Sequence, residues 1–171
     1  MKHILFLAWL VLFAGLPAMA GQTLTPVAER PQAPRFSLPD LDGERVDWKR
    51  FEGRPVIVNF WATWCPPCRA ELPAMNRAWR ILEKEGVAMV AINVGEDVDT
   101  VFTFTGDYPI DFPVLLDEEG VVVKEWGVRA LPTTYVVDGA GHIVYRAVGG
   151  REWDDPELLE RIRALGEERN P

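Results

Sequence analysis

Two continuous apolar runs, both rich in β-branched residues, lie near the middle of the chain, at residues 55–61 (PVIVNFW) and 87–94 (VAMVAINV). Runs of this length and composition are typical of strands that are buried on both faces of a sheet. Residues 69–85, between them, carry apolar side chains at helical spacing, namely Leu72, Met75, Trp79 and Leu82. Two strands joined by a helix form a βαβ unit, which predicts parallel strands and a right-handed crossover.

Two hairpins are predicted on either side of this unit. The first covers residues 36–46, where the turn-forming residues 39–43 (PDLDG) separate two short segments. The second joins strands at residues 133–137 and 142–148, because the intervening Asp138-Gly139-Ala140-Gly141 is a strong turn signal.

The remaining elements have weaker patterns. They are a helix capped by Asp97 or Asp99 that runs to about residue 106, a short apolar run at residues 112–116 and a helix at residues 118–127. The last helix is expected to start at Asp154 or Asp155, with Pro156 in its first turn. Its apolar stripe indicates a core-facing side: Leu158, Leu159, Ile162 and Leu165. This order of elements predicts an α/β fold with a central mixed β-sheet flanked by helices.

The first twenty residues have the pattern of a secretory signal peptide. Lys2 supplies a positive charge, residues 4–16 form an apolar run, and residues 18–20 (AMA) match a small-residue cleavage site. We therefore expect cleavage after Ala20 and export to the periplasm. An uncleaved signal anchor is the alternative, although this run of 13 residues is shorter than the roughly 20 that span a bilayer.

The signal peptide at residues 1–20 leaves two further parts of the chain. Residues 21–34 are rich in Pro and polar residues, and we expect them to be a flexible N-terminal segment. Residues 35–171 then form the single folded domain.

Composition excludes several classes of protein. The chain has 171 residues, of which 48% are hydrophobic, so it can bury an ordinary core and is not disordered as a whole. Its net charge of −8 is unsuited to binding nucleic acid. Two cysteines form neither a disulfide scaffold nor, on their own, a four-ligand zinc site.

Those two cysteines, Cys65 and Cys68, lie between the first buried strand and the long helix. A C-x-x-C at a helix N-terminus beside a βαβ unit is typical of a thioredoxin-like redox site, because the helix end favours a thiolate. A purely structural disulfide would contribute only about 2 kcal/mol across so short a loop. We therefore expect a redox-active disulfide, with Cys65 as the exposed nucleophile and Cys68 as the partly buried resolving thiol.

Two prolines between the cysteines limit how well a Cys65 thiolate is stabilised. Such a thiolate would accept hydrogen bonds from the first helical turn, but Pro66 and Pro67 have no N–H. Pro67 also disfavours the helical conformation at Pro66, so the helix is expected to begin at Pro67 or Cys68. A moderately stabilised thiolate predicts a reducing pair rather than an oxidising one of the DsbA type.

The segment at residues 60–73 (FWATWCPPCRAELP) resembles the active-site segment of the thioredoxin superfamily, and most closely that of the exported TlpA/ResA-like thiol–disulfide oxidoreductases. Three further stretches agree with this resemblance: residues 93–96 (NVGE), 112–117 (FPVLLD) and 131–135 (LPTTY). The resemblance covers residues 36–165. It implies a thioredoxin-like fold with an N-terminal β-hairpin and an insertion around residues 97–112.

The same resemblance assigns roles around the cysteines. Pro132 would be a cis-proline facing the pair, and Glu71 and Glu96 would lie near the dithiol. Glu71 would take up or deliver a proton when Cys68 attacks a mixed disulfide. From the residues alone, Glu71 is equally a favourable residue near a helix start, Glu96 a solvated acid and Pro132 a trans-proline.

Other residues near the pair are assigned with less specific signals. Asn59 occupies the place of the buried Asp of cytoplasmic thioredoxins, which makes Glu71 the nearest carboxyl for proton transfer. Packing is the expected role of Trp61. The expected substrate-binding residues are Trp64, Leu131 and Thr133. The aromatic-rich residues 101–112 either pack in the core, which is the simpler reading, or shape a substrate groove.

Together these features predict an enzyme that reduces disulfides in exported proteins. The substrate that the resemblance implies is apocytochrome c. A membrane thiol carrier would return electrons to it, and neither a cofactor nor a metal is implied. The alternatives are a disulfide oxidase or isomerase, a thiol peroxidase, and a copper-delivery module that would use His142. Nothing in the sequence indicates an oligomeric state.

Overall fold

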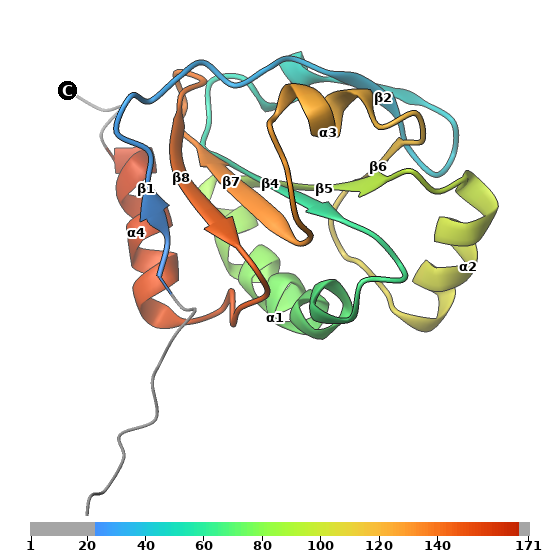
Figure 1. Ribbon diagram of the computed structural model, residues 1–171. Helices are drawn as coiled ribbons and strands as arrows, with labels where there is room; N and C mark the ends of the chain where they lie inside the picture. The colour runs from blue at the N-terminus through green and yellow to red at the C-terminus, as the bar shows by residue number, and fades with distance from the viewer. Residues whose placement is uncertain (1–22, 168–171) are drawn as a thin grey trace, which may run out of the picture.

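The buried strand pair lies in the interior of a six-stranded sheet in the computed structural model, which describes residues 23–167 (Figure 1). Strand β4 (Val56–Trp61) lies parallel to β5 (Ala88–Val94), and helix α1 (Pro66–Leu82) connects them. Every residue of β4 is buried. The predicted βαβ unit is therefore confirmed, while the predicted signal peptide lies outside the described residues.

Four further strands complete this mixed sheet. They are β6 (Val114–Asp117), parallel to β5, and the antiparallel β7 (Thr133–Val137), β8 (Ile143–Val148) and β1 (Thr25–Pro26). The strand order is β1-β8-β7-β4-β5-β6. The predicted second hairpin is β7–β8, whose turn is closed by the Asp138 carboxylate accepting backbone N–H groups of Ala140 and His142.

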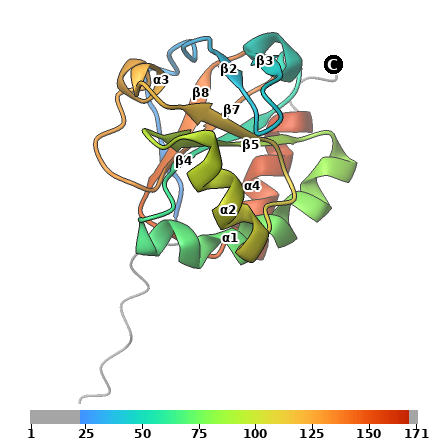
Figure 2. The same ribbon diagram turned by 90° about the vertical axis from the view of Figure 1, so that its right-hand side faces the viewer.

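Helices and a small hairpin cover the two faces of the sheet (Figures 1 and 2). One face carries α1, which continues into the short 3₁₀ turn η2 (Glu83–Glu85), and α4 (Pro156–Glu167). The other carries the predicted N-terminal hairpin β2 (Ser37–Pro39) and β3 (Arg45–Asp47), with η1 (Trp48–Phe51) and α3 (Val121–Glu125). Helix α2 (Val98–Asp107) occupies the insertion between β5 and β6. The predicted α/β class is confirmed.

Neighbouring strand residues send their side chains into different cores. Trp61 belongs to the core beneath α1 and α4, whereas Phe60 belongs to the aromatic core beneath the hairpin and α3. The core-facing role predicted for the stripe of α4 is confirmed, since all four of its side chains are buried: Leu158, Leu159, Ile162 and Leu165.

The prediction of a flexible segment at residues 21–34 is wrong for the part that the structure describes. Residues 25–26 form β1 against β8, and the Leu24 side chain is buried in the core. Further along, the Ala33 N–H donates to the Gly141 carbonyl at 2.9 Å. The outer edge of β8 needs partners for its backbone groups, and this segment supplies them.

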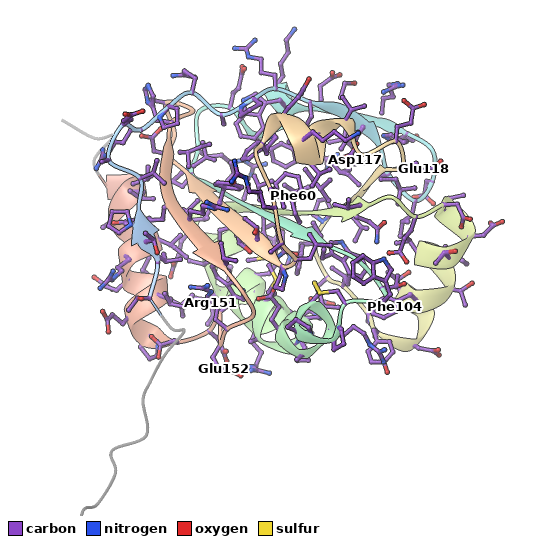
Figure 3. The ribbon with its side chains drawn as sticks, in the orientation of Figure 1. Phe60, Phe104, Asp117, Glu118, Arg151 and Glu152 are labelled. Carbon is purple, nitrogen blue, oxygen red and sulfur yellow. A yellow bond between two sulfur atoms is a disulfide. The ribbon has the colours of Figure 1, made fainter. Side chains whose placement is uncertain are left out.

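The helix predicted at residues 118–127 begins later, at Val121. The buried Asp117 carboxylate accepts the backbone N–H groups of Val121, Val122 and Val123, which fixes the first turn of α3 (Figure 3). The helix therefore starts where these donors can reach the carboxylate.

Candidate functional site

Cys65 and Cys68 form a disulfide at the N-terminus of α1. Cys65 is the residue that caps the helix, and its Sγ accepts the Cys68 N–H at 3.3 Å. The first helical hydrogen bond runs from the Arg69 N–H to the Cys65 carbonyl at 3.1 Å. The helix therefore begins at Pro66, not at Pro67 or Cys68 as expected, because the first two helical positions need no N–H.

The cysteines differ little in exposure. In the disulfide form Cys65 is 3% exposed and Cys68 is fully buried. The order of exposure is as predicted, but the expectation of an exposed Cys65 is wrong for the disulfide form, in which the residue is buried. The preceding Trp64 is 68% exposed, and it is the large apolar side chain that reaches solvent next to the pair.

The loop that precedes β7 meets the disulfide at one end of the sheet. Thr133 pairs with Phe60, so Pro132 lies at the end of β4 that leads into Cys65. The Leu131–Pro132 peptide bond is cis, as the resemblance predicted. Leu131 is half-buried. The Thr133 side chain is fully buried, and its hydroxyl donates to the Ala130 carbonyl at 2.7 Å, so the side chain is not open to a substrate.

Glu71 is a buried carboxyl group one turn after Cys68. The Asn59 side-chain N–H donates to its Oε1 at 3.0 Å, and the Trp153 indole N–H donates to its Oε2 at 2.9 Å. Burial raises the pKa of Glu71 from 4.5 to about 7, against the lowering effect of these hydrogen bonds. The group can therefore hold or release a proton near neutral pH.

Asn59 links Glu71 to the strand that follows the cis-proline. Its side-chain N–H group also donates to the Thr134 hydroxyl at 2.9 Å. We expected Asn59 to lie beneath the site, with Glu71 as the nearest carboxyl group. The direct hydrogen bond from Asn59 to Glu71 agrees with this expectation.

Arg151 is the charged residue that acts on the Glu71 carboxyl group. Its backbone N–H donates to Glu71 Oε2 at 3.3 Å, and its positive charge favours the carboxylate. The guanidinium is held by the carbonyls of Thr23, Val148 and Gly149. A small pocket of about 250 Å³ borders Glu71 and Arg151 and is also lined by Pro67, Ala70, Gly150 and Glu152.

Glu96 stabilises the loop that leads into Cys65. It accepts the backbone N–H of Thr63 at 2.7 Å and the side-chain N–H of Asn93 at 2.8 Å. It is thus tied to residues two positions before Cys65 and at the end of β5. Among the described residues its hydrogen-bond partners differ from those of Glu71, so the two acids occupy separate positions around the disulfide.

The aromatic-rich segment is divided between core and surface. Val101 and Phe112 are buried, and Phe104 packs against the buried Trp61 with ring centroids 5.3 Å apart, which confirms packing for Trp61. Tyr108 stacks on Phe104 and remains partly exposed. The Arg69 guanidinium donates to the Tyr108 hydroxyl at 2.6 Å. Figure 3 places the disulfide between the labelled Phe104 and Arg151.

Sequence reasoning missed Arg151 and Trp153. They lie 80 and 82 residues from Glu71 in the chain, in a loop with no periodic pattern. A Gly-Gly-Arg sequence before a charged helix start gives no signal of contact with a distant carboxyl group.

His142, the candidate copper ligand, lies at the other end of the sheet from the disulfide. Its Nε2 atom lies 2.8 Å from the side-chain Nε2 of Gln32. Within residues 23–167, no group of three or more His, Cys, Asp or Glu side chains is arranged to hold a metal ion. In the same residues, no helix has the length and apolarity needed to cross a bilayer.

A disulfide at the start of a helix that follows a central strand, on a mixed sheet with helices on both faces, defines a thiol–disulfide oxidoreductase of thioredoxin-like fold. The model of the AhpC/TSA family matches residues 30–146. ResA of Geobacillus thermodenitrificans (strain NG80-2), a thiol–disulfide oxidoreductase, is 40% identical over 140 residues, which cover 81% of this chain and 80% of that protein. ResA of Bacillus subtilis (strain 168) is 37% identical over 72% of this chain and 69% of its own length.

Solved structures agree with these relatives. A DsbE-type thiol:disulfide interchange protein of Chlorobium tepidum aligns with a TM-score of 0.74 and 31% identity, covering 84% of this chain and 99% of that one. A secreted Mycobacterium tuberculosis disulfide oxidoreductase homologous to DsbE aligns with a TM-score of 0.66 and 27% identity, over 81% and 99%. The chain belongs to the AhpC/TSA family of the thioredoxin superfamily and is a thiol–disulfide oxidoreductase of the ResA/DsbE type.

Proposed function

We propose that this oxidoreductase works outside the cytoplasm and reduces disulfides in exported proteins. The signal-peptide pattern of residues 1–20 supports export. One of its structural relatives is described as secreted. The proposed substrates are exported proteins with disulfides, among them apocytochrome c, whose haem-site cysteines must be thiols.

The proposed reaction is two successive thiol–disulfide exchanges. The Cys65 thiolate attacks a substrate disulfide, which releases one substrate thiolate and forms a mixed disulfide. Cys68 then attacks the Cys65 sulfur of that mixed disulfide, which releases the second substrate thiolate and closes the Cys65–Cys68 bond. The substrate gains two electrons and two protons, and the protein leaves as the disulfide.

Glu71 is the proposed proton acceptor for Cys68. It lies three residues further along α1, on the same side of the helix, and is half ionised near pH 7. The carboxylate takes the thiol proton as Cys68 becomes the attacking thiolate. Glu96 is proposed to act on Cys65 through the Thr63 backbone, by keeping the loop before it in place.

Substrate binding is proposed for the surface beside the disulfide. Trp64 offers an exposed aromatic face, and Leu131 offers a half-buried apolar side chain on the neighbouring loop. Thr133 would contribute only through its backbone, because its side chain is buried. A membrane thiol carrier is the proposed source of electrons for the next cycle, since the periplasm is kept oxidising.

The observation that favours the reducing direction is the poor set of donors around Cys65. Pro66 and Pro67 occupy the first two helical positions, and the Cys68 N–H at 3.3 Å is the backbone donor that reaches Sγ. A thiolate held by few donors is a good nucleophile but is little stabilised, so the disulfide is favoured over the dithiol.

The deciding experiment is the reduction potential of the Cys65–Cys68 pair, measured against defined thiol buffers. A value near or below that of thioredoxin, about −270 mV, is expected for a reductase. A value near that of DsbA, about −120 mV, would contradict the proposal and favour an oxidase. Turnover of hydrogen peroxide by the same sample would instead favour a thiol peroxidase.

A further inference from the structure

Residues 149–153, the first part of the loop between β8 and α4, hold one oxygen of the Glu71 carboxyl group. The Trp153 indole N–H donates to Oε2 at 2.9 Å, and the Arg151 backbone N–H donates to the same oxygen at 3.3 Å. Trp153 is fully buried, so its N–H is a fixed donor that water does not replace. The loop therefore determines which way the carboxyl group of α1 faces.

This loop is itself fixed against the active-site helix and the sheet. A Cβ atom at Gly150 would lie 2.8 Å from the Pro67 carbonyl oxygen, so the loop touches the backbone between the two cysteines. The guanidinium of Arg151 is anchored by the Thr23, Val148 and Gly149 carbonyls and lies 5.5 Å from the centre of the Trp153 ring. The indole is thereby held between a packed cation and the carboxyl group.

We propose that Trp153 is a positioning residue for thiol–disulfide exchange, whose indole N–H orients the Glu71 carboxyl and favours its charged form. Asn59 holds the other oxygen, so removing the indole donor would leave Oε2 with the longer hydrogen bond from the Arg151 backbone N–H. The proposal rests on the proton-transfer role proposed above for Glu71. It adds a residue that touches neither substrate nor sulfur but acts through Glu71.

The charge of Glu71 depends on few neighbours. Loop 149–153 contributes Arg151, which favours the carboxylate, and Glu152, which lines the same pocket and pairs with Arg77 at 3.5 Å. The strands contribute only neutral groups, Asn59 of β4 and Thr134 of β7, and α1 contributes the thiols of the cysteine pair when reduced. In the disulfide form the two cysteines do not titrate. The effect of the indole N–H on the Glu71 carboxyl group can therefore be measured in that form without a contribution from the thiols.

The first test replaces the indole without emptying its site. Trp153→Phe keeps an aromatic ring and removes the N–H, and the Glu71 carboxyl midpoint is followed by ¹³C NMR in the oxidised protein. We expect the midpoint to rise by about one to two pH units above its value of about 7, because a carboxylate loses a hydrogen bond. An unchanged midpoint would overturn the proposal.

Trp126→Phe is the matched control. Trp126 is also a buried tryptophan, but its indole nitrogen has no hydrogen-bond partner among the described residues and it lies in the other core. This variant should leave the Glu71 midpoint where it is. A shift equal to that of Trp153→Phe would mean that any loss of aromatic packing moves Glu71, and would also overturn the proposal.

A second measurement uses the unaltered protein and stays decisive even if Trp153→Phe does not fold. The ¹H–¹⁵N indole signal of Trp153 should titrate with the same midpoint as the Glu71 carboxyl group. The indole of Trp61, which has no such partner among the described residues, should not follow it. A Trp153 signal that is flat through the Glu71 midpoint contradicts the proposal.

Kinetics separate this proposal from the function on which it rests. The rate of disulfide reduction should show a pH step that moves upward in Trp153→Phe and is absent in both Glu71→Gln and the double variant. If Glu71→Gln keeps the step, the proton-transfer role of Glu71 is wrong and the role of Trp153 in exchange falls with it. If Glu71→Gln loses the step but Trp153→Phe leaves it unmoved, only the proposal for Trp153 is wrong.

Discussion

Asn59 is the neutral neighbour that leaves Glu71 as the single carboxyl group among the buried residues around it that the structure describes. Its side-chain N–H faces Glu71 Oε1 at 3.0 Å, and its own Oδ1 has no hydrogen-bond partner among the described residues. An acid at this position would place two carboxyl groups within hydrogen-bond distance in a region with little water. Such a pair shares one proton and titrates in two steps.

We therefore expect Asn59→Asp to raise the upper midpoint of the carboxyl pair by at least about one pH unit above that of Glu71 alone, which is about 7. The carboxyl ¹³C signals of the oxidised protein report both steps. Asn93→Asp is the control, because Asn93 is equally buried but contacts Glu96. A Glu71 midpoint that stays at about 7 in Asn59→Asp would contradict the close contact between these residues.

At the scale of single residues, the sequence predicted the features that depend on residues close together in the chain. The disulfide, the cis-proline and the burial of Trp61 carry local signals, in spacing or in resemblance. The pairing of Glu71 with Trp153 has none, because the two residues are 82 positions apart and meet only in the folded chain. Thr133 was expected among the substrate-binding residues, and its buried side chain leaves that role to its backbone.

At the scale of elements, the accuracy of prediction followed the strength of the pattern. The strands β4 and β5 and the helix between them have long apolar runs or strict periodicity, and their positions agree within a few residues. The two-residue strand β1 has no pattern to detect and exists because the β8 edge needs partners. Its Pro26 fits an edge strand, where a missing N–H can point away from the ladder.

Gly150 connects two elements, since its absent side chain lets loop 149–153 touch the Pro67 carbonyl at the start of α1. In Gly150→Ala the new Cβ would lie 2.8 Å from that oxygen, which belongs to the backbone and cannot turn aside as a flexible side chain could. The loop or the helix start must then move, which we expect to lower the free energy of unfolding by about 1–3 kcal/mol. Urea denaturation of the oxidised protein measures this change.

Gly106→Ala is the comparison for this change. Gly106 lies in α2, and a Cβ there meets no atom within 4 Å, so alanine should stabilise the helix slightly, by up to about 1 kcal/mol. Equal effects of the two substitutions would show that the close approach of the loop to Pro67 contributes nothing to stability.

The whole molecule gathers four loops at one end of its sheet. The loops after β4, β5 and β8 and the loop before β7 bring together the disulfide, Glu96, the Arg151–Trp153 pair and the cis-proline, as the strand registers require. Parallel pairing of β4 with β5 and antiparallel pairing with β7 are what make these ends coincide. A buried titratable group at this meeting point is therefore coupled to the stability of the entire fold.

That coupling predicts a stability that falls as pH rises. The folded-state pKa of Glu71, about 7, lies above its ordinary value of 4.5, so the folded protein binds its proton more tightly than the unfolded chain does. The contribution is complete below about pH 4.5 and is lost as pH rises through 7. The difference between these two pKa values corresponds to about 3 kcal/mol.

The measurement is the free energy of unfolding of the oxidised protein between pH 5 and pH 8, compared with Glu71→Gln, so that other titrating groups cancel in the difference. The unaltered protein should lose up to about 3 kcal/mol relative to the variant over this range. Glutamine cannot ionise, so its own curve should lack the Glu71 component. Parallel curves would contradict the prediction, because they would mean that Glu71 titrates alike in the folded and unfolded states.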